Sequence, residues 1–270
     1  MTRALWLKYG VLCAAWLALS VILLFGSWVC EDAYITLRVV DNFTQGYGLR
    51  WNIADRVQVY THPLWLLLHL PFAALVDNLF HLNMILSLVV SSSAFALVLY
   101  TFRHLPLQVV GLLFLLPVFL SKTLLDYAGS GLETPLSYLC FAALGYVMVH
   151  GRNWRLFWLA ASLLTSLLLL NRLDHVILIA PFAAWFIWQS PTRARLSHIM
   201  LGATPLAMWL AFSLIYYGFL FPNTKYAKLD TGFGLSDYLS QGTHYAFIWL
   251  TQDTASALMV ALGCIYAFLS

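Results

Sequence analysis

The sequence predicts an all-α, polytopic membrane protein, and two observations support this fold class. Of the 270 residues, 62% are hydrophobic and only 9% are charged, whereas a soluble domain is roughly one quarter charged. Apolar runs near the length that crosses about 30 Å of hydrocarbon recur along nearly the whole chain. Because backbone polar groups inside lipid must be satisfied internally, such runs favour a helical bundle. We expect residues 1–270 to form one transmembrane domain with no soluble domain.

About eight or nine membrane segments are expected, separated mostly by short turns. The candidate segments are 9–29, 63–77, 82–101, 105–121, 135–149, 155–171, 175–189, 197–217 and 254–270. Two connections, 30–62 and 218–253, are long enough to carry function. The chain ends at residue 270 without a flanking charge or aromatic anchor, which is unusual for a membrane helix and indicates truncation of the natural chain.

The positions of Lys and Arg predict how the chain crosses the membrane, because these residues favour the cytoplasmic side. Arg3 and Lys8 place the N-terminus inside, and basic turns at 150–155 and 193–198 mark two more cytoplasmic positions. The segments expected outside are then 30–62, 121–134, 171–174 and 218–253. One of the short, proline-containing segments 63–77 and 105–121 then cannot cross fully. We expect a multi-pass protein of the inner (cytoplasmic) membrane with its active site facing the periplasm or outside.

Charge and metal-ligand spacing restrict the possible partners. The net charge of +3 is spread between loops, with no basic block among aromatic residues, so nucleic acid is not an expected partner. Cysteines and histidines show no metal-ligand spacing, and no metal site is assigned. A requirement for a divalent metal stays open.

The first outer connection begins with two adjacent carboxylates, Glu31 and Asp32, where the chain leaves the bilayer. A carboxylate at the edge of hydrocarbon is partly desolvated, which makes it a better acceptor for a proton from a sugar hydroxyl. The same pair can instead be a plain interfacial charge.

An amphipathic helix lying in the membrane plane is expected next, because its apolar and polar residues fall on opposite faces. The apolar face carries Ala33, Leu37, Val40 and Phe43, and the polar face carries Arg38, Asp41, Asn42 and Gln45. Gly46-Tyr47-Gly48 ends this helix. We expect Arg38, Arg50 and Arg56 near headgroup depth, where they bind either a substrate phosphate or ordinary anionic lipid.

Three further polar groups are predicted to face outward, each with an alternative role. Glu133 either caps the following helix or binds substrate. Arg172 and Asp174 interrupt two apolar segments, where ionisable residues are functional candidates, although they can also pair with each other. Asn223, Lys225 and Lys228 lie among aromatic residues. They suit a phosphate or a sugar ring, and an interfacial aromatic belt with snorkelling lysines explains them as well.

These residues together resemble the motifs of GT-C glycosyltransferases related to the mycobacterial terminal β-(1→2)-arabinofuranosyltransferase. The N-terminal motif comprises Glu31-Asp32-Ala33-Tyr34-Ile35, Arg38, Gly46-Tyr47-Gly48-Leu49, Trp51-Asn52, and Val57 to Tyr60 with Thr61 before Leu64-Trp65. The later motifs are Ser130-Gly131-Leu132-Glu133-Thr134, Arg172 with Asp174, and Tyr217-Gly218 through Pro222-Asn223-Thr224 to Lys228. They follow in the same order and span residues 31–228.

The resemblance implies a GT-C fold, a polyprenyl-phosphate-sugar donor, and Asp32 as the base, with Glu31 beside it. The substrate-binding residues expected are Arg38, Trp51, Asn52, Tyr60, His62, Glu133, Arg172, Asp174, Asn223, Lys225 and Lys228. The acceptor would be a glycan, lipid or protein, reached by inverting transfer at the membrane. This sequence departs from the pattern at Glu31, His62 and His175, which puts the sugar in doubt. Two alternatives stay open, a lipid-linked-sugar translocase or transporter and a non-catalytic scaffold subunit.

Overall fold

The computed structural model describes residues 3–188, 192–224 and 234–269, and within these ranges it is helical, with no strand. The helices are α1 (Arg3–Gly26), α2 (Ala33–Thr44), α3 (Pro63–Ala73), α4 (Leu79–Thr101), α5 (Leu107–Val110), the π-helix η1 (Gly111–Leu115), α6 (Leu116–Leu120), α7 (Lys122–Ala128), α8 (Thr134–His150), α9 (Phe157–Asn171), the 3-10 helix η2 (Leu173–His175), α10 (Val176–Trp188), α11 (Arg193–Gly202), α12 (Thr204–Tyr217), α14 (Leu235–Gln252) and α15 (Thr254–Leu269). The predicted all-α class is therefore confirmed.

Two of the described helices are long and apolar enough to cross a membrane. They are Leu5–Gly26 within α1 and Leu79–Thr101, which is α4. Two bent pairs could each add a span, Leu107–Leu120 with Lys122–Ala128 at 71° and Arg195–Gly202 with Thr204–Tyr217 at 43°. The described helices thus supply two to four spans by length and composition. The expected eight or nine crossings are not confirmed.

The short segment at 63–77 forms a helix of only 11 residues, Pro63–Ala73. At 1.5 Å per residue it is roughly 16 Å long, about half the hydrocarbon thickness. This length agrees with the expectation that one proline-containing segment does not cross. The other short segment, 105–121, is divided into α5, η1 and α6 before the sharp bend at Ser121.

The amphipathic helix predicted after the first carboxylates is α2, and it ends at Thr44 just before Gly46, which has a positive φ of 84°. Of the apolar face, Ala33, Leu37 and Val40 are buried against the bundle and Phe43 is 42% exposed. Asn42, placed on the polar face, is buried. The Asn42 amide donates 2.9 Å hydrogen bonds to the carbonyls of Arg50 and Trp51, which fold the following loop back onto the helix.

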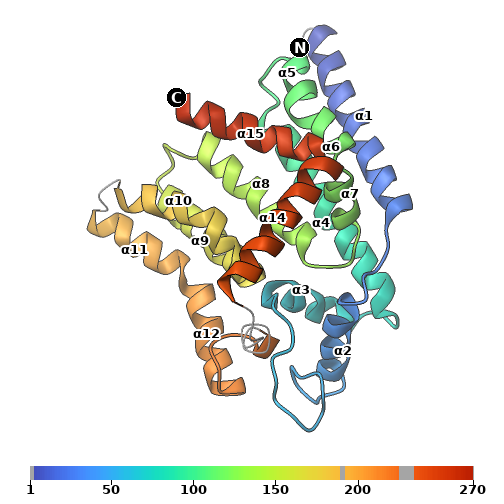
Figure 1. The fold of residues 1–270 in the computed structure, drawn as a ribbon, viewed down its shortest axis with the longest axis vertical. Coiled ribbons are helices and arrows are strands. Elements are labelled where there is room, and N and C mark those ends of the chain that lie inside the picture. Colours follow the sequence, from blue (N-terminus) through green and yellow to red (C-terminus); the bar gives the residue numbers. More distant parts are fainter. Residues whose placement is uncertain (1–2, 189–191, 225–233, 270) are drawn as a thin grey trace.

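The largest apolar core lies between α2, α3, α4, α8, α9 and α12 (Figure 1). Its fully buried side chains include Trp65, Leu66 and Leu168. A separate cluster joins α1 to α4 and α7 through Leu19, Leu23, Phe95 and Ala128. Contacts between helices thus hold the bundle together. Many apolar side chains of α1 nevertheless point away from the bundle, and Phe25 is 85% exposed.

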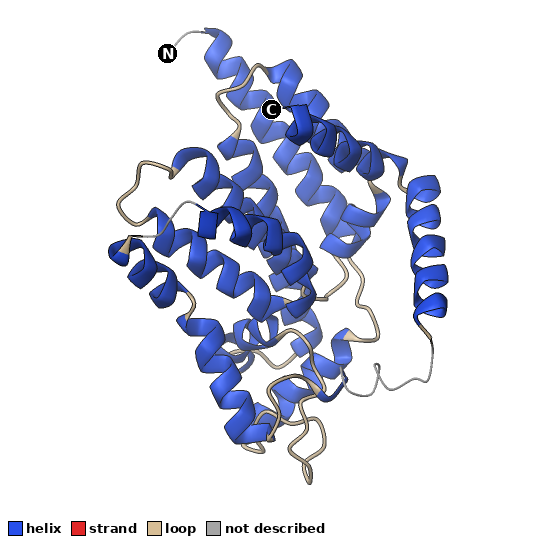
Figure 2. Cartoon of the chain, turned by 60° about the vertical axis from the view of Figure 1, so that its left-hand side comes forward, coloured by secondary structure: helices blue, strands red, loops and turns tan. Residues whose placement is uncertain are grey.

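The segment 218–253, expected from the sequence to be a long connection, contains a helix. Helix α14 covers Leu235–Gln252 and has no buried residue. Figure 2 shows it at the edge of the molecule, joined to α15. The described loop in this connection is therefore much shorter than expected.

Parts of the four segments expected to lie outside contact one another at one end of the bundle. The backbone N–H groups of Trp28 and Cys30 each donate 2.9 Å hydrogen bonds to the carbonyls of Gly129 and Ser130. The N–H of Asn223 likewise donates to the carbonyl of Gln58 at 3.0 Å. Within the described residues, polar side chains from these segments therefore lie near one another, while their side of a membrane stays a prediction.

Candidate functional site

Glu133 is the centre of a polar cluster at this end of the molecule. Its side chain is only 4% exposed, and its two oxygens have different partners. Oε1 lies 2.5 Å from Nη1 of Arg172, and Oε2 lies 3.2 Å from Nδ1 of His62. The same guanidinium donates to Asp174, with Nη2 to Oδ2 at 2.6 Å and Nε to Oδ1 at 2.9 Å. Arg172 therefore bridges a buried carboxylate and an exposed one.

All four residues of this cluster lie at or beside the ends of helices. His62 precedes α3, Glu133 precedes α8, Arg172 follows α9, and Asp174 lies in η2. Glu133 makes no side-chain capping hydrogen bond with α8. Of the two roles left open for Glu133, the contacts therefore favour pairing within the site over capping.

Arg172 and Asp174 do pair with each other, as one alternative proposed, and Arg172 also reaches the interior. The hydrogen bonds from Arg172 lower the pKa of Asp174 below 3.8, because a cationic donor favours the ionised acid. The guanidinium is 40% exposed and Asp174 is 56% exposed. Such an exposed pair contributes little stability, so the contact with buried Glu133 is the energetically important one.

His62 is held in the neutral state. Burial lowers its pKa from 6.5, Glu133 opposes this shift, and Arg172 adds to it. A carboxylate only accepts hydrogen bonds, so the neutral ring carries its proton on Nδ1 and donates to Glu133. Nε2 then accepts from the hydroxyl of Thr36, 2.5 Å away. Thr36 was not among the site residues expected from the sequence. It nevertheless follows Asp32 at the i+4 spacing that places both residues on one helical face.

This lowered pKa predicts an acid-sensitive fold. Because the folded pKa of His62 lies below 6.5, its contribution to stability is complete above pH 6.5 and is lost as the pH falls toward the folded pKa, by at most about 1.4 kcal/mol per pH unit. Thermal unfolding in detergent micelles between pH 7.5 and 5 should show a smaller loss in His62→Asn than in the wild type. The exposed His81 provides the control, and a wild-type pH profile in His62→Asn would contradict the assignment.

A second hydrogen-bond network, between the end of α9 and the start of α8, lies next to the cluster. The amide of Asn171 donates to the carbonyl of Glu133 at 2.9 Å and to Oγ of Ser137 at 2.8 Å. The Ser137 hydroxyl lies 2.8 Å from Nε2 of His175. This network fixes the end of α9 against the start of α8, which sets the position of Arg172 relative to Glu133.

Glu31 and Asp32 lie beside this cluster and are exposed in the folded chain. Asp32 is near enough to His62 to affect its pKa electrostatically. The backbone hydrogen bond from Cys30 to Ser130 holds the carboxylates next to the segment that carries Glu133. Any desolvation of these acids must therefore come from lipid or a bound substrate.

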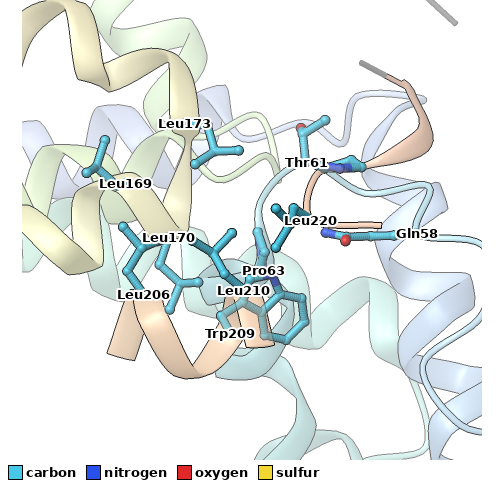
Figure 3. Close-up of a pocket in the computed structure, with 11 residues that line it drawn as sticks. Gln58, Thr61, Pro63, Leu169, Leu170, Leu173, Leu206, Trp209, Leu210 and Leu220 are labelled. Atoms are coloured by element: carbon cyan, nitrogen blue, oxygen red, sulfur yellow. The ribbon is translucent and has the colours of Figure 1, made fainter. Parts of the chain in front are cut away.

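A cavity of about 680 Å³ opens beside the cluster. Its walls are mainly apolar, and its polar lining residues are Thr61, Arg172, Asp174 and Thr224. The buried Oγ1 of Thr224 has no hydrogen-bond partner among the described residues. Figure 3 shows a smaller inner pocket with which this cavity shares wall residues, where leucines of α9 and α12 lie near Thr61 and Pro63. The volume of the larger cavity, about 680 Å³, falls in the range of ligand sites, about 300–1,000 Å³.

Other predicted binding residues lie outside this cavity. Nε of Arg38 donates a hydrogen bond to the carbonyl of Trp51 at 3.2 Å, and the Arg38 guanidinium lies 5.1 Å from the centroid of the Trp51 ring. Asn52 is exposed in the adjacent loop. Tyr60 is buried, and its hydroxyl lies 2.7 Å from that of Tyr217. These contacts give Arg38, Trp51 and Tyr60 structural roles in the outer loop.

The last predicted group is only partly described. Asn223 is anchored by its backbone to Gln58, and its buried Oδ1 has no partner in the part of the chain that the structure describes. Lys225 and Lys228 lie outside the described residues, directly after Thr224 of the cavity wall. In the described part of the chain, no three His, Cys, Asp or Glu side chains form a group that could hold a metal ion.

Comparison of the chain with known proteins found no matching family model, no matching curated protein and no matching solved structure. The functional argument therefore depends on the motifs and on the geometry of this end of the bundle.

Proposed function

We propose that the chain is a membrane glycosyltransferase that moves a sugar, with arabinofuranose as the first candidate, from a polyprenyl-phosphate donor to a cell-envelope acceptor. The observation that carries this proposal is the cluster of His62, Glu133, Arg172 and Asp174 at the rim of an apolar-walled cavity. Asp32, the base implied by the resemblance, lies beside the same cluster.

The cavity matches the two chemical parts of such a donor. Leu169, Leu206 and Leu210 offer an apolar wall for the lipid chain. At the polar part of the lining, the guanidinium of Arg172 can bind a phosphate through charge-assisted hydrogen bonds. The hydroxyl of Thr224, which has no partner among the described residues, is proposed to bind the phosphate or the sugar.

The proposed reaction is an inverting substitution at the anomeric carbon. The acceptor hydroxyl oxygen forms a bond to that carbon, its proton passes to Asp32, and the bond to the phosphate oxygen breaks. The electron pair leaves with the lipid phosphate. Arg172 stabilises the charge that develops on this phosphate, because preorganised charge is commonly a large catalytic contribution. Glu133 and His62 hold Arg172 in place, and Lys225 and Lys228 are proposed as further phosphate ligands.

The test is Asp32→Asn expressed in the native host. Removal of a general base is expected to lower transfer by about 10²–10⁴-fold. One sugar should disappear from the surface glycan while its lipid-linked donor accumulates in solvent extracts. Asp41→Asn is the matched control, since Asp41 is an exposed carboxylate on the same helix α2.

Membrane levels of both variants must equal those of the wild type by immunoblot. Unchanged glycans in Asp32→Asn at equal expression would reject the role of Asp32 and favour a scaffold subunit. Loss of the glycan without donor accumulation on the outer leaflet would instead favour a translocase.

A further inference from the structure

A second cavity lies between α1 and α4, at the end of the bundle opposite the candidate site. It has a volume of about 330 Å³. Leu12, Cys13 and Trp16 of α1 face Ala96 and Leu99 of α4 across it, and Tyr9, Tyr100 and Arg103 complete the lining. Since α4 runs from the region of the candidate site at Leu79 toward Thr101, this groove is remote from Arg172.

Two hydrogen bonds bracket the groove along α1. Nζ of Lys8 donates to the carbonyl of Leu105 at 2.6 Å, and the indole N–H of Trp16 donates to the carbonyl of Ser92 at 3.0 Å. Between these two contacts the helices leave space over eight residues of α1, about 12 Å. The two hydrogen bonds therefore fix α1 against the chain on either side of an open groove.

The location of the groove identifies the solvent that it faces. Helices α1 and α4 contain the two segments that are long and apolar enough to cross a membrane, so their shared outer groove faces hydrocarbon. Tyr9 and Tyr100 lie at its end, where amphipathic rings are typical of headgroup depth.

The charge at this end is positive and uncompensated. Arg103 has no acidic partner among the described residues, and its guanidinium lies 3.7 Å from the ring centroid of Tyr100. One of its N–H groups donates to the carbonyl of Tyr100 at 2.6 Å, which leaves other donors available. Lys8 adds a second cation nearby through its bond to Leu105. The sequence has no Asp or Glu in 1–30 or 78–125.

We infer that this groove binds one acyl chain of an anionic phospholipid, with Arg103 and Lys8 at the phosphate. The apolar walls suit the chain, and the cations complement the headgroup. A zwitterionic lipid of the same chain length lacks the net negative charge that these cations select. Each cation near a membrane surface is expected to strengthen the attraction by about fivefold.

Cys13 provides a reporter within the groove, because it is exposed and lines the cavity. In a full-length variant with Cys30, Cys140 and Cys264 changed to serine, the rate of N-ethylmaleimide addition can be followed by mass spectrometry. The probes are dioleoylphosphatidylglycerol and dioleoylphosphatidylcholine at equal mole fraction in dodecyl maltoside micelles. We expect phosphatidylglycerol to slow the labelling of Cys13 about 25-fold more than phosphatidylcholine does, because two cations contribute about fivefold each.

Arg103→Gln should remove most of this difference, whereas Arg152→Gln, which changes an exposed arginine outside the groove, should keep it. Ala96→Phe, which fills the wall, should weaken protection by phosphatidylglycerol as well. Equal melting temperatures in phosphatidylcholine micelles would confirm that the variants fold. Equal protection by the two lipids, or full protection by sodium phosphate without lipid, would overturn the inference.

Discussion

Replacing Arg172 with leucine should destabilise the folded protein and abolish sugar transfer. Glu133 is only 3% exposed, and without Arg172 its one remaining side-chain partner among the described residues is neutral His62. Breaking a buried ion pair typically costs about 3–5 kcal/mol. Because the Arg172 side chain is 40% exposed, solvent screens part of the interaction and we expect about 2–3 kcal/mol. The apparent melting temperature in detergent micelles is the measurement.

Asp174→Asn is the matched control for this experiment. It removes the other carboxylate of Arg172, but that pair is exposed, so the expected loss is below about 1 kcal/mol. A double variant, Arg172→Leu with Glu133→Leu, should regain much of the stability because it removes both buried charges. It should remain inactive if Arg172 binds the phosphate. Similar losses in Arg172→Leu and Asp174→Asn would contradict the central place given to Glu133.

The sequence could predict which residues gather at the candidate site better than how they contact each other. Tracking Lys and Arg along the chain placed 30–62, 121–134 and 171–174 on one side, and Glu133, Arg172 and Asp174 do meet. The pairing itself was not predictable, because Glu133 lies 39 residues from Arg172 along the chain. Only the packing of α8 against α9 brings them together. Thr36 was missed because its partner, His62, lies 26 residues away along the chain.

Hydropathy likewise predicts that segments are apolar helices without fixing their length or bend. The segment 105–121 is apolar throughout, yet it ends at a sharp bend where Ser121 caps α7 through the N–H of Leu124. The buried carboxylate of Asp253 accepts a 2.7 Å hydrogen bond from the same serine. The cap is a local contact, but the hydrogen bond to Asp253 joins side chains 132 residues apart. A window of neighbouring residues therefore contains no information about this second contact.

Gly131→Ala, a substitution in the turn before Glu133, should disrupt the site. Gly131 has a φ of +74°, and adopting this conformation costs an L-residue about 1–2 kcal/mol. An added methyl group would also collide with the side-chain amide of Asn83. Asn83 is fully buried and holds His69 through a 3.1 Å hydrogen bond. Overpacking of this kind costs about 1–3 kcal/mol, so the total loss should be about 2–5 kcal/mol.

Gly46→Ala separates the two causes, because Gly46 has a φ of +84° with no atom near the added methyl group. It should lose only the conformational part, about 1–2 kcal/mol. The carbonyl of Gly131 also accepts a hydrogen bond from the indole N–H of Trp65 at 3.3 Å. A shift of this turn would therefore also displace Glu133, which lies two residues after Gly131. Gly131→Ala should therefore reduce sugar transfer even at a temperature where the protein remains folded. Equal stability losses in the two variants would show that Asn83 yields to the methyl group, and the turn would then not be what positions Glu133.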